Sequence, residues 1–475
     1  MKNHSLNKNS ISDLIRNEEK RSVIILALAI IIYSITFSYL SIRGHMLYLT
    51  GADLAIFEQS FWSTLHGEFF YTSIGGGSQF GIHNSPVLFL VIPFYAVFQN
   101  TETLLVVQSV LLALGAFPLY LIGKKAHSAK IGLSFAFLYL IYSPLHGVNL
   151  IDFHEIAFFP LFAGLCIYML INERWNWFFI FALLILFIKE DCALIVIMIG
   201  IFGLIIHRAS DKKIKLLLAG LILIASAWLI ISFFIIIPAF HQPGQSVNLN
   251  HYVNIPGNLL NHNDARISYI IHLFLPVCFL PLLAPLYLIP AIPAFGETLL
   301  PDRFEYFSIF YHYSALLIPF IFVSAIYGFK RLLSLKNGYL SSKTNFILIF
   351  LLIVSIISLV ISPMSILINE TIINGKMTDQ FRLNSFMLPK IPEDFSISTQ
   401  WDLLPHLPHR NNLYEGYNKN TDLVIIDKSS AFIRDIQMSK EDLENYTNLY
   451  QNGNLIILGN RESPRVKQLQ THPLT

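Results

Sequence analysis

The sequence predicts an all-α membrane bundle of about 10 to 12 transmembrane helices, followed by a small C-terminal α/β domain. Hydrophobic residues make up 54% of the 475 residues and charged residues only 13%, whereas soluble domains carry about a quarter of charged residues. The charges are also unevenly placed, because residues 365–475 hold 24 of the 62 and the preceding 364 residues hold 38. These observations exclude one large soluble enzyme.

Nine apolar segments suit membrane spans, for which about 20 mostly apolar residues are needed. Some of them are shorter than this, which leaves the total number of spans open. The nine segments are Ser22–Ile42, Glu102–Ile122, Ile131–Leu150, Ile156–Ile171, Trp175–Ile188, Asp191–Ile206, Ile214–Ile237, Tyr313–Phe329 and Asn345–Ile361.

Two further apolar stretches do not suit simple spans. Ile267–Phe295 is interrupted by five prolines, which favours a broken hairpin that enters and leaves the membrane on one side. Asn84–Phe98 is short and follows a polar loop, which favours an interfacial or re-entrant helix.

The distribution of Lys and Arg orients the predicted spans. With residues 1–21 in the cytoplasm, 17 of the 21 Lys and Arg residues before residue 365 fall on the cytoplasmic side and four fall outside. We therefore expect a multi-pass plasma-membrane protein with a transmembrane domain at 22–364, a long outer loop at 43–83 and an extracytoplasmic domain at 365–475. A net charge of +2 and the lack of a basic arm give no case for nucleic acid as a partner.

The outer loop 43–83 contains an amphipathic helix that we expect to lie on the membrane surface. Its apolar residues recur at helical spacing at Leu54, Phe57, Phe61 and Leu65. Asp53 stands at the start of this helix, where an aspartate commonly caps a helix. The alternative is a functional role: a carboxylate at the lipid–water boundary is partly desolvated, which raises its pKa and makes it a usable general base. Glu58 lies five residues further along.

Two more outer loops gather ionisable residues. Asp152, His154 and Glu155 lie in a short loop that is either a solvated turn or a site for a divalent metal or a hydroxyl-rich ligand. Lys189-Glu190-Asp191 interrupts an apolar run, either as a polar turn with internal ion pairs or as a site where Lys189 binds a phosphate. Weaker candidates flank the broken hairpin: His251, Tyr252, Arg266, Glu297, Arg303, Glu305, His312 and Tyr313.

The C-terminal residues predict a small α/β domain. Ser396–Thr399, Leu423–Ile426 and Leu455–Leu458 are typical of short strands, and Ser439-Lys-Glu-Asp442 predicts a helix start that Gly453 would end. His406 and His409 are three residues apart, but the proline between them argues against a helical metal site and favours a structural loop.

The order of motifs resembles an uncharacterised family of predicted prokaryotic multi-pass membrane proteins over nearly the whole chain. The motifs are Asp53-Leu-x-Ile-Phe-x-Gln, Ile82-His83-x-Ser85-Pro86, Asp152-Phe-His154, Lys189-Glu-Asp191, His312-Tyr313 and Leu403-Leu-Pro-His-Leu-x-His-Arg410. The family brings no established reaction with it.

More distantly, the layout is similar to GT-C glycosyltransferases, which use polyprenyl-phosphate sugars at the outer membrane face. This resemblance implies a hexosyltransferase with Asp53 and Glu58 as catalytic residues and Asp152 or Glu155 as the second acid. His83, His154, Lys189, Glu190, Asp191, Arg266, His312 and Tyr313 would bind substrate, and the acceptor would be a glycan, lipid or protein.

Metal dependence stays open, because Leu rather than a second acid follows Asp53. A divalent cation, Mg²⁺ or Mn²⁺, would be held by Asp53, Asp152, His154 and Glu155. The Pro86 segment also lacks the lysine usual in that superfamily, so Lys189, Arg266 or Arg303 would bind the phosphate.

Two rival hypotheses remain. Broken helices with buried charges also mark transporters and lipid flippases, although no inverted repeat is evident and the polar residues gather at one rim. The third hypothesis is an assembly factor whose C-terminal domain binds a partner. Carboxylates around a cavity at the outer face would favour the transferase, and a polar path through the membrane centre would favour transport.

Overall fold

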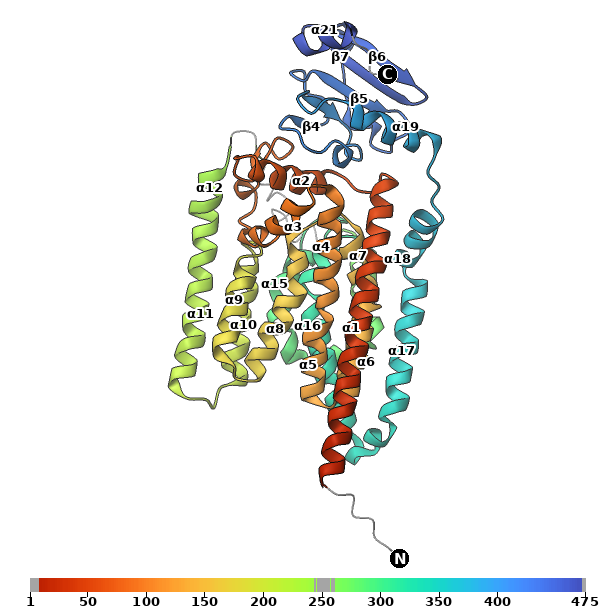
Figure 1. Cartoon of the computed structure of the whole chain (residues 1–475). Helices are drawn as coiled ribbons and strands as arrows, with labels where there is room; N and C mark the ends of the chain where they lie inside the picture. Colours follow the sequence, from red (N-terminus) through yellow and green to blue (C-terminus); the bar gives the residue numbers. More distant parts are fainter. Residues whose placement is uncertain (1–7, 243–244, 246–256, 258–260, 472–475) are drawn as a thin grey trace, which may run out of the picture.

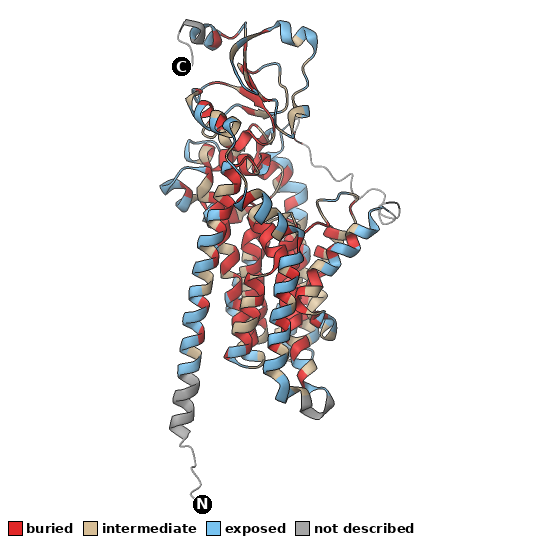
Figure 2. Ribbon diagram, turned by 90° about the vertical axis from the view of Figure 1, so that its right-hand side faces the viewer, coloured by how far each residue is buried: buried red, intermediate tan, exposed pale blue. Residues whose placement is uncertain are grey.

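The computed structural model describes residues 8–242, 245, 257 and 261–471 of the chain. The structure is elongated, with the start of α1 at one end of a helical bundle and the C-terminal domain at the other (Figure 1). In the bundle, buried residues gather in the interior, and exposed residues run along the outer helices (Figure 2). Many of these exposed residues are apolar, for example Ile32, Phe234 and Phe346, as expected for helices that face lipid.

Every one of the nine predicted spans falls on helical structure. The helices of the bundle are α1 (Lys8–Met46), α4 (Thr101–Leu114), α5 (Ala116–Ala126), α6 (Ala129–Leu140), α7 (Ser143–Leu150), α8 (Phe159–Ile171), α9 (Trp175–Leu186), α10 (Cys192–Ile206), α11 (Lys212–Ile231), α12 (Ile237–Phe240), α16 (Ile318–Ser334), α17 (Thr344–Ile361) and α18 (Pro363–Ile366). A π-helical turn, η4 (Ser232–Ile236), joins α11 to α12, and another, η11 (Leu367–Ile373), extends α18.

Within the described residues, four helices are long and apolar enough to cross a membrane: Asn17–Met46, Thr101–Ala126, Lys212–Phe240 and Leu340–Ile361. The pair α6 and α7, bent by 49°, makes a fifth if it is one span. Several other predicted spans are helices of only 12 to 15 residues, so the expected number of about 10 to 12 stays a prediction. The helical segment also continues to Ile373, past the domain boundary expected at Ser365.

Local sequence accounts for the breaks in these helices. Gly115 separates α4 from α5, where an added Cβ would lie 2.2 Å from the Tyr139 hydroxyl, so only glycine allows α6 to approach this closely. That hydroxyl donates to the Leu112 carbonyl at 2.7 Å, which also accepts the Gly115 backbone N–H at 3.1 Å. Pro144 begins α7 after the bend, because proline cannot continue the hydrogen bonding of α6.

The proline-rich stretch is broken as predicted. It consists of α14 (Asn263–Phe274), η6 (Leu275–Val277), η7 (Leu280–Leu283), η8 (Pro285–Ala291) and α15 (Ile292–Leu299). Its irregular backbone is bonded within the protein, since the Ser324 hydroxyl of α16 donates to the carbonyls of Pro281 and Ala284 at 2.9 and 2.8 Å. Another short turn, η9 (His312–Leu316), leads into α16, and η10 (Lys336–Lys343) leads out of it.

The loop at residues 43–83, which is expected outside the membrane, folds into a compact layer, the outer layer, between the bundle and the C-terminal domain (Figure 1). It contains the predicted amphipathic helix α2 (Ala52–Leu65), a hairpin of β1 (Tyr71–Thr72) and β2 (Gly77–Ser78), and the turn η1 (Gln79–Gly81). The apolar stretch after it forms η2 (Pro86–Leu90) and the short α3 (Ile92–Val97), in agreement with the non-spanning helix expected there. A third short turn, η3 (Glu155–Phe158), precedes α8.

The C-terminal domain contains a five-stranded sheet in the order β4-β3-β5-β7-β6. β3 (Ile397–Thr399), β5 (Leu423–Asp427) and β7 (Leu455–Asn460) are the three predicted strands, and β4 (Leu413–Glu415) and β6 (Tyr446–Asn452) are additional. β3 is parallel to β4 and β5, and β7 is antiparallel to β5 and β6. The other elements are α19 (Asp379–Met387), η12 (Leu388–Lys390), η13 (Leu404–His406), η14 (Ile433–Asp435), α20 (Lys440–Glu444) and α21 (Pro464–Thr471).

One prediction for this domain is wrong. Ser439 does start a helix, through a capping box with Asp442, but α20 ends at Glu444 rather than at Gly453. The reason is that Gly453, with φ of +54°, forms the turn between β6 and β7. A left-handed glycine suits a hairpin turn as well as a helix end, so the sequence signal was ambiguous.

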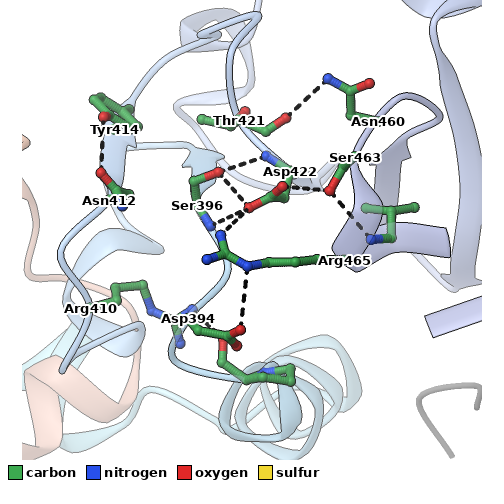
Figure 3. A network of polar contacts seen from close by, with 12 residues as sticks. Asp394, Ser396, Arg410, Asn412, Tyr414, Thr421, Asp422, Asn460, Ser463 and Arg465 are labelled. Atoms are coloured by element: carbon green, nitrogen blue, oxygen red, sulfur yellow. Dashed lines mark hydrogen bonds and ion pairs between the residues drawn. The ribbon is translucent and has the colours of Figure 1, made fainter. Parts of the chain in front are cut away.

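Asp422 fastens the edges of the domain together (Figure 3). Its carboxylate accepts hydrogen bonds from the Ser396 backbone N–H and hydroxyl at 2.9 and 2.7 Å, and from the Ser463 hydroxyl at 2.6 Å. Arg465 bridges it to Asp394, at 3.2 and 3.4 Å. The segments before β3 and β5 and the start of α21 are thereby held at one corner of the domain.

The same domain is bonded to the outer layer. The Gln59 amide on α2 donates to the Arg410 carbonyl at 2.7 Å, and the Ser73 hydroxyl donates to the Leu413 carbonyl at 2.8 Å. The Trp401 indole lies so close to Gly51, just before α2, that an added Cβ would lie 2.0 Å from it. The helix α2 is therefore held on one side by the bundle and on the other by the C-terminal domain.

Candidate functional site

A cavity of about 740 Å³ lies where α2, the η1–η2 segment, the turn between α9 and α10, α15 and η9 meet. Nine of the twelve site residues expected from the sequence line it: Asp53, His83, His154, Glu155, Lys189, Glu190, Asp191, His312 and Tyr313. They come from five separate parts of the chain, so the cavity collects ionisable residues from several connections between the helices. Apolar side chains, among them Phe57, Leu194 and Phe233, make up much of the remaining lining.

Asp53 lies in the first turn of α2 and reaches the cavity with a side chain that is 54% exposed. It is not the helix cap, because Gly51 occupies that position and no side chain caps the helix. A carboxylate in the first turn is nevertheless favoured by the positive end of the helix dipole. The His154 Nε2 atom lies 3.4 Å from the Asp53 carboxylate.

One proton is shared between Asp53 and His154. The His154 Nδ1 atom lies 2.9 Å from the Asp152 carbonyl, which only accepts, so Nδ1 carries a hydrogen and Nε2 is left to face the carboxylate. Two lone pairs would repel there, so a proton lies between them. Burial opposes ionisation of both groups, but their contact outweighs it, which lowers the pKa of Asp53 and raises that of His154. The expected upward shift at Asp53 is therefore wrong, because the imidazolium outweighs desolvation.

Asp152 lies beneath the cavity rather than on its wall. It is fully buried and accepts the Gly51 backbone N–H at 2.9 Å, which fixes the start of α2. Burial, followed by the charge of Asp53, raises the Asp152 pKa to about 7. Gln108 on α4 shapes this loop, although no pattern in the sequence singles it out. Its side-chain amide donates to the Asp152 carbonyl at 3.2 Å and accepts from the His154 backbone N–H at 2.9 Å.

A second carboxylate–imidazole pair lines the same cavity. The His83 Nδ1 atom lies 2.8 Å from one Glu190 oxygen, and the Asn84 backbone N–H donates to the other at 2.9 Å. Burial opposes the charge on both side chains, but the pair outweighs burial, lowering the pKa of Glu190 and raising that of His83. Lys189 and Asp191 form an adjacent ion pair at 2.9 Å.

Several polar atoms on the cavity lining have no hydrogen-bond partner in the described part of the protein. They are Oε2 of Glu155, Oδ1 of Asp191 and Nδ1 of His312. Buried polar atoms are costly without partners, so these positions suit a hydroxyl-bearing ligand. Glu297 also lines the cavity, and its pKa is raised to about 8 by burial and by the charge of Asp191, so its carboxyl can donate as well as accept.

Three expected residues do not reach the cavity: Asp152, Glu58 and Arg266. Glu58 faces away from it, is 2% exposed, and contacts the Tyr95 hydroxyl at 2.5 Å and His409 of the C-terminal domain at 3.3 Å. Arg266 donates to the backbone carbonyls of Asn261, Leu299 and Pro301, which gives it a structural position. His251 and Tyr252 lie outside the described residues.

The four residues named for a divalent cation do not form a metal site in this geometry. Across residues 8–242, 245, 257 and 261–471, no three His, Cys, Asp or Glu side chains are grouped so as to hold a metal ion. Asp152 is directed at Gly51 and Asp53 at His154. We therefore derive no chemical step through a metal.

Comparison with known proteins identifies a family but not a reaction. No curated protein matches the chain. An oligosaccharyltransferase of Archaeoglobus fulgidus, crystallised with a tethered acceptor peptide, is similar at 12% identity over 92% of this chain and 74% of its own, with a TM-score of 0.44. A TM-score this low supports no conclusion about the function of this chain. The family model described as "Predicted membrane protein (DUF2079)" matches residues 43–462, and the chain belongs to this family.

Proposed function

We propose that the protein is an integral-membrane glycosyltransferase that uses a polyprenyl-phosphate sugar at the outer membrane face. The observation that carries the proposal is the cavity itself, in which a carboxylate–imidazole pair and unpartnered acceptors lie beside apolar surface. A sugar has hydroxyl groups that can donate hydrogen bonds to Glu155 Oε2 and Asp191 Oδ1, two carboxylate oxygens of the lining without a partner among the described residues. A lipid chain suits the apolar lining, where Leu194 and Phe233 are 41% and 38% exposed.

Asp53 is the general base in this mechanism. As the acceptor oxygen attacks the sugar carbon, its hydroxyl becomes far more acidic, so a carboxylate that is ionised at neutral pH is basic enough to take the proton. His154 keeps Asp53 ionised and orients it, and Asp152 fixes the helix that carries it. The acceptor is a hydroxyl group of a glycan, lipid or protein.

The test is loss of product in cells. The gene is deleted, the glycolipid or glycoprotein that disappears is identified, and the strain is complemented with variants. Asp53→Asn preserves the shape of a half-exposed side chain and cannot take a proton at neutral pH, so the rate should fall by about 10²- to 10⁴-fold while the protein accumulates normally.

Glu58→Gln is the matched control, because Glu58 is on the same helix but outside the cavity. It should restore the product. Full product with Asp53→Asn would exclude Asp53 as the base. A deletion strain that loses no glycan and instead fails to take up or export a solute would favour the rival hypothesis of a transporter.

A further inference from the structure

The proposed mechanism leaves the second carboxylate–imidazole pair, His83 and Glu190, without a role. Glu190 is almost fully buried, with a side chain that is 6% exposed, whereas the His83 imidazole is 36% exposed and lines the cavity. Both Glu190 oxygens are occupied, one by His83 Nδ1 at 2.8 Å and one by the Asn84 N–H at 2.9 Å. A carboxylate that accepts from Nδ1 leaves Nε2 as the ring atom available to a ligand.

The imidazole is held in place by bonds between distant segments. The Val87 backbone N–H donates to the Phe187 carbonyl at 2.7 Å, and the Asn84 amide donates to the Ser232 hydroxyl at 2.8 Å. The segment that carries His83 is thus joined both to the α9–α10 turn and to η4. A side chain fixed in this way loses little conformational entropy when it binds a ligand.

The other cations considered for a phosphate are already engaged. Lys189 is paired with Asp191 at 2.9 Å, and Arg303 contacts Glu305 at 3.5 Å with a side chain that is 48% exposed. Arg266 is bonded to backbone carbonyls and does not line the cavity. Among these groups, His83 lines the cavity with a partner that fixes its orientation and leaves Nε2 available to a ligand.

We propose that His83, oriented by Glu190, binds the phosphate of the lipid-linked donor through Nε2 and stabilises the charge that develops on it when the sugar leaves. This rests on the proposed function. In the reaction, the acceptor oxygen bonds to the sugar carbon, and the bond from that carbon to the phosphate oxygen breaks. The electron pair of the broken bond stays on the phosphate, the acceptor proton goes to Asp53, and the imidazolium donates a charge-assisted hydrogen bond to the phosphate.

The surroundings of His83 favour its charged form. Burial disfavours the imidazolium, but Glu190 outweighs it, and the pKa of His83 lies above its usual value of about 6.5. Binding of an anion should therefore weaken as pH rises through this raised pKa. The charged and titratable groups around His83 are Glu190, Lys189, Glu155, Glu297, Asp53 and His312.

The experiment measures binding of citronellyl methyl phosphate to the purified full-length protein in detergent between pH 6 and 9. This isoprenoid phosphate diester keeps one negative charge throughout that range, so any pH dependence comes from the protein. The wild type should bind it at least about 10-fold more weakly at the alkaline end, in line with loss of one charge-assisted hydrogen bond. The neutral alcohol citronellol should show no such dependence.

Two variants and a control separate the outcomes. His83→Gln should bind weakly at every pH, and Glu190→Gln, which keeps an acceptor for Nδ1, should move the loss of binding to lower pH. Glu173→Gln is the control. It removes the carboxylate from another His–Glu pair, in which Glu173 lies 3.8 Å from His207, at the end of α10 opposite to the cavity. It should change neither the affinity for the phosphate diester nor its pH dependence.

If His83→Gln and Glu190→Gln both bind the diester with the affinity and pH dependence of the wild type, His83 does not bind the phosphate. Binding by the wild type would in that case still support a lipid-phosphate donor. Absence of wild-type binding would overturn this inference together with the lipid-phosphate donor. The cellular test of Asp53 would then still decide whether the protein makes a glycan product.

Discussion

The contact between Trp401 and Gly51 gives the sharpest test of how the C-terminal domain affects the site. In Gly51→Ala, the new Cβ would lie 2.0 Å from the Trp401 ring, against 3.4–4 Å for ordinary contact. The two parts must therefore separate by about 1.5 Å, and overpacking of this kind typically costs about 1–3 kcal/mol of unfolding free energy. The ring cannot easily move away, because the Trp401 backbone N–H donates to the Asp435 carboxylate at 3.2 Å and the ring packs on Phe432 at a centroid distance of 4.7 Å.

The displacement should also reach Asp53, the proposed general base. Gly51 precedes α2 and donates its N–H to Asp152 at 2.9 Å, and Asp53 is only two residues further on. A shift of about 1 Å at a catalytic group can reduce the rate by about 10²-fold. Gly51→Ala should therefore lower both stability and product formation.

A double-mutant cycle with Trp401→Ala isolates the contact. Unfolding free energies are measured by chemical denaturation in detergent micelles for the wild type, both single variants and the double variant. Without the indole, the added methyl group has room, so Gly51→Ala should cost less than about 0.5 kcal/mol in that background. An equal cost in both backgrounds would show that the strain lies in the backbone of Gly51 and not against the C-terminal domain.

Two further predictions concern topology and pH. In intact cells, Lys428→Cys in the C-terminal domain should react with an impermeant thiol reagent, and Lys213→Cys in the first turn of α11 should react only after lysis. The reverse pattern would invert the orientation and place the cavity in the cytoplasm. The second concerns the Glu58–His409 contact, which raises the pKa of His409. A pKa that is higher in the folded than in the unfolded state means that protonated His409 stabilises the fold. This stabilisation is complete below the unfolded pKa of about 6.5 and is lost as pH rises through the higher folded pKa. The unfolding free energy of the wild type should therefore fall between these two pKa values. Glu58→Gln should cost about 1–3 kcal/mol at pH 6 and remove the pH dependence; a dependence that persists in Glu58→Gln would assign it to another group.

The parts of the fold set by local sequence were predictable. Apolar runs identified the helices of the bundle, prolines identified the broken stretch from α14 to α15, and helical spacing identified α2. What could not be predicted was where a neighbouring element interrupts a run, as Tyr139 does at Gly115. The strand β4 is only three residues long and depends on pairing with β3, so its own sequence gave little signal.

The candidate site was predictable as a set of loops but not as a set of contacts. The unusual presence of charges in apolar runs identified Asp53, Asp152, His154 and Lys189, because such residues are costly in a membrane protein unless they have partners. Helical spacing puts Glu58 about 140° around α2 from Asp53, but the resemblance to GT-C enzymes grouped the two, and the structure shows that Glu58 faces away from the cavity. Nor could it assign Glu190 to His83, a pairing 107 residues apart in the chain.

The geometry of the site has a consequence for how mutations in it must be interpreted. Its ionisable groups form pairs across distant segments, with Asp53 against His154 and His83 against Glu190, because single charges could not be kept in this environment. The same pairs hold the outer layer on the bundle, so removing either partner both loosens the structure and changes the chemistry. Loss of product alone therefore cannot identify a catalytic residue in this protein. Variants that keep the hydrogen bond but change the charge, such as Asp53→Asn and Glu190→Gln, separate the two effects, since packing is retained while proton affinity is not.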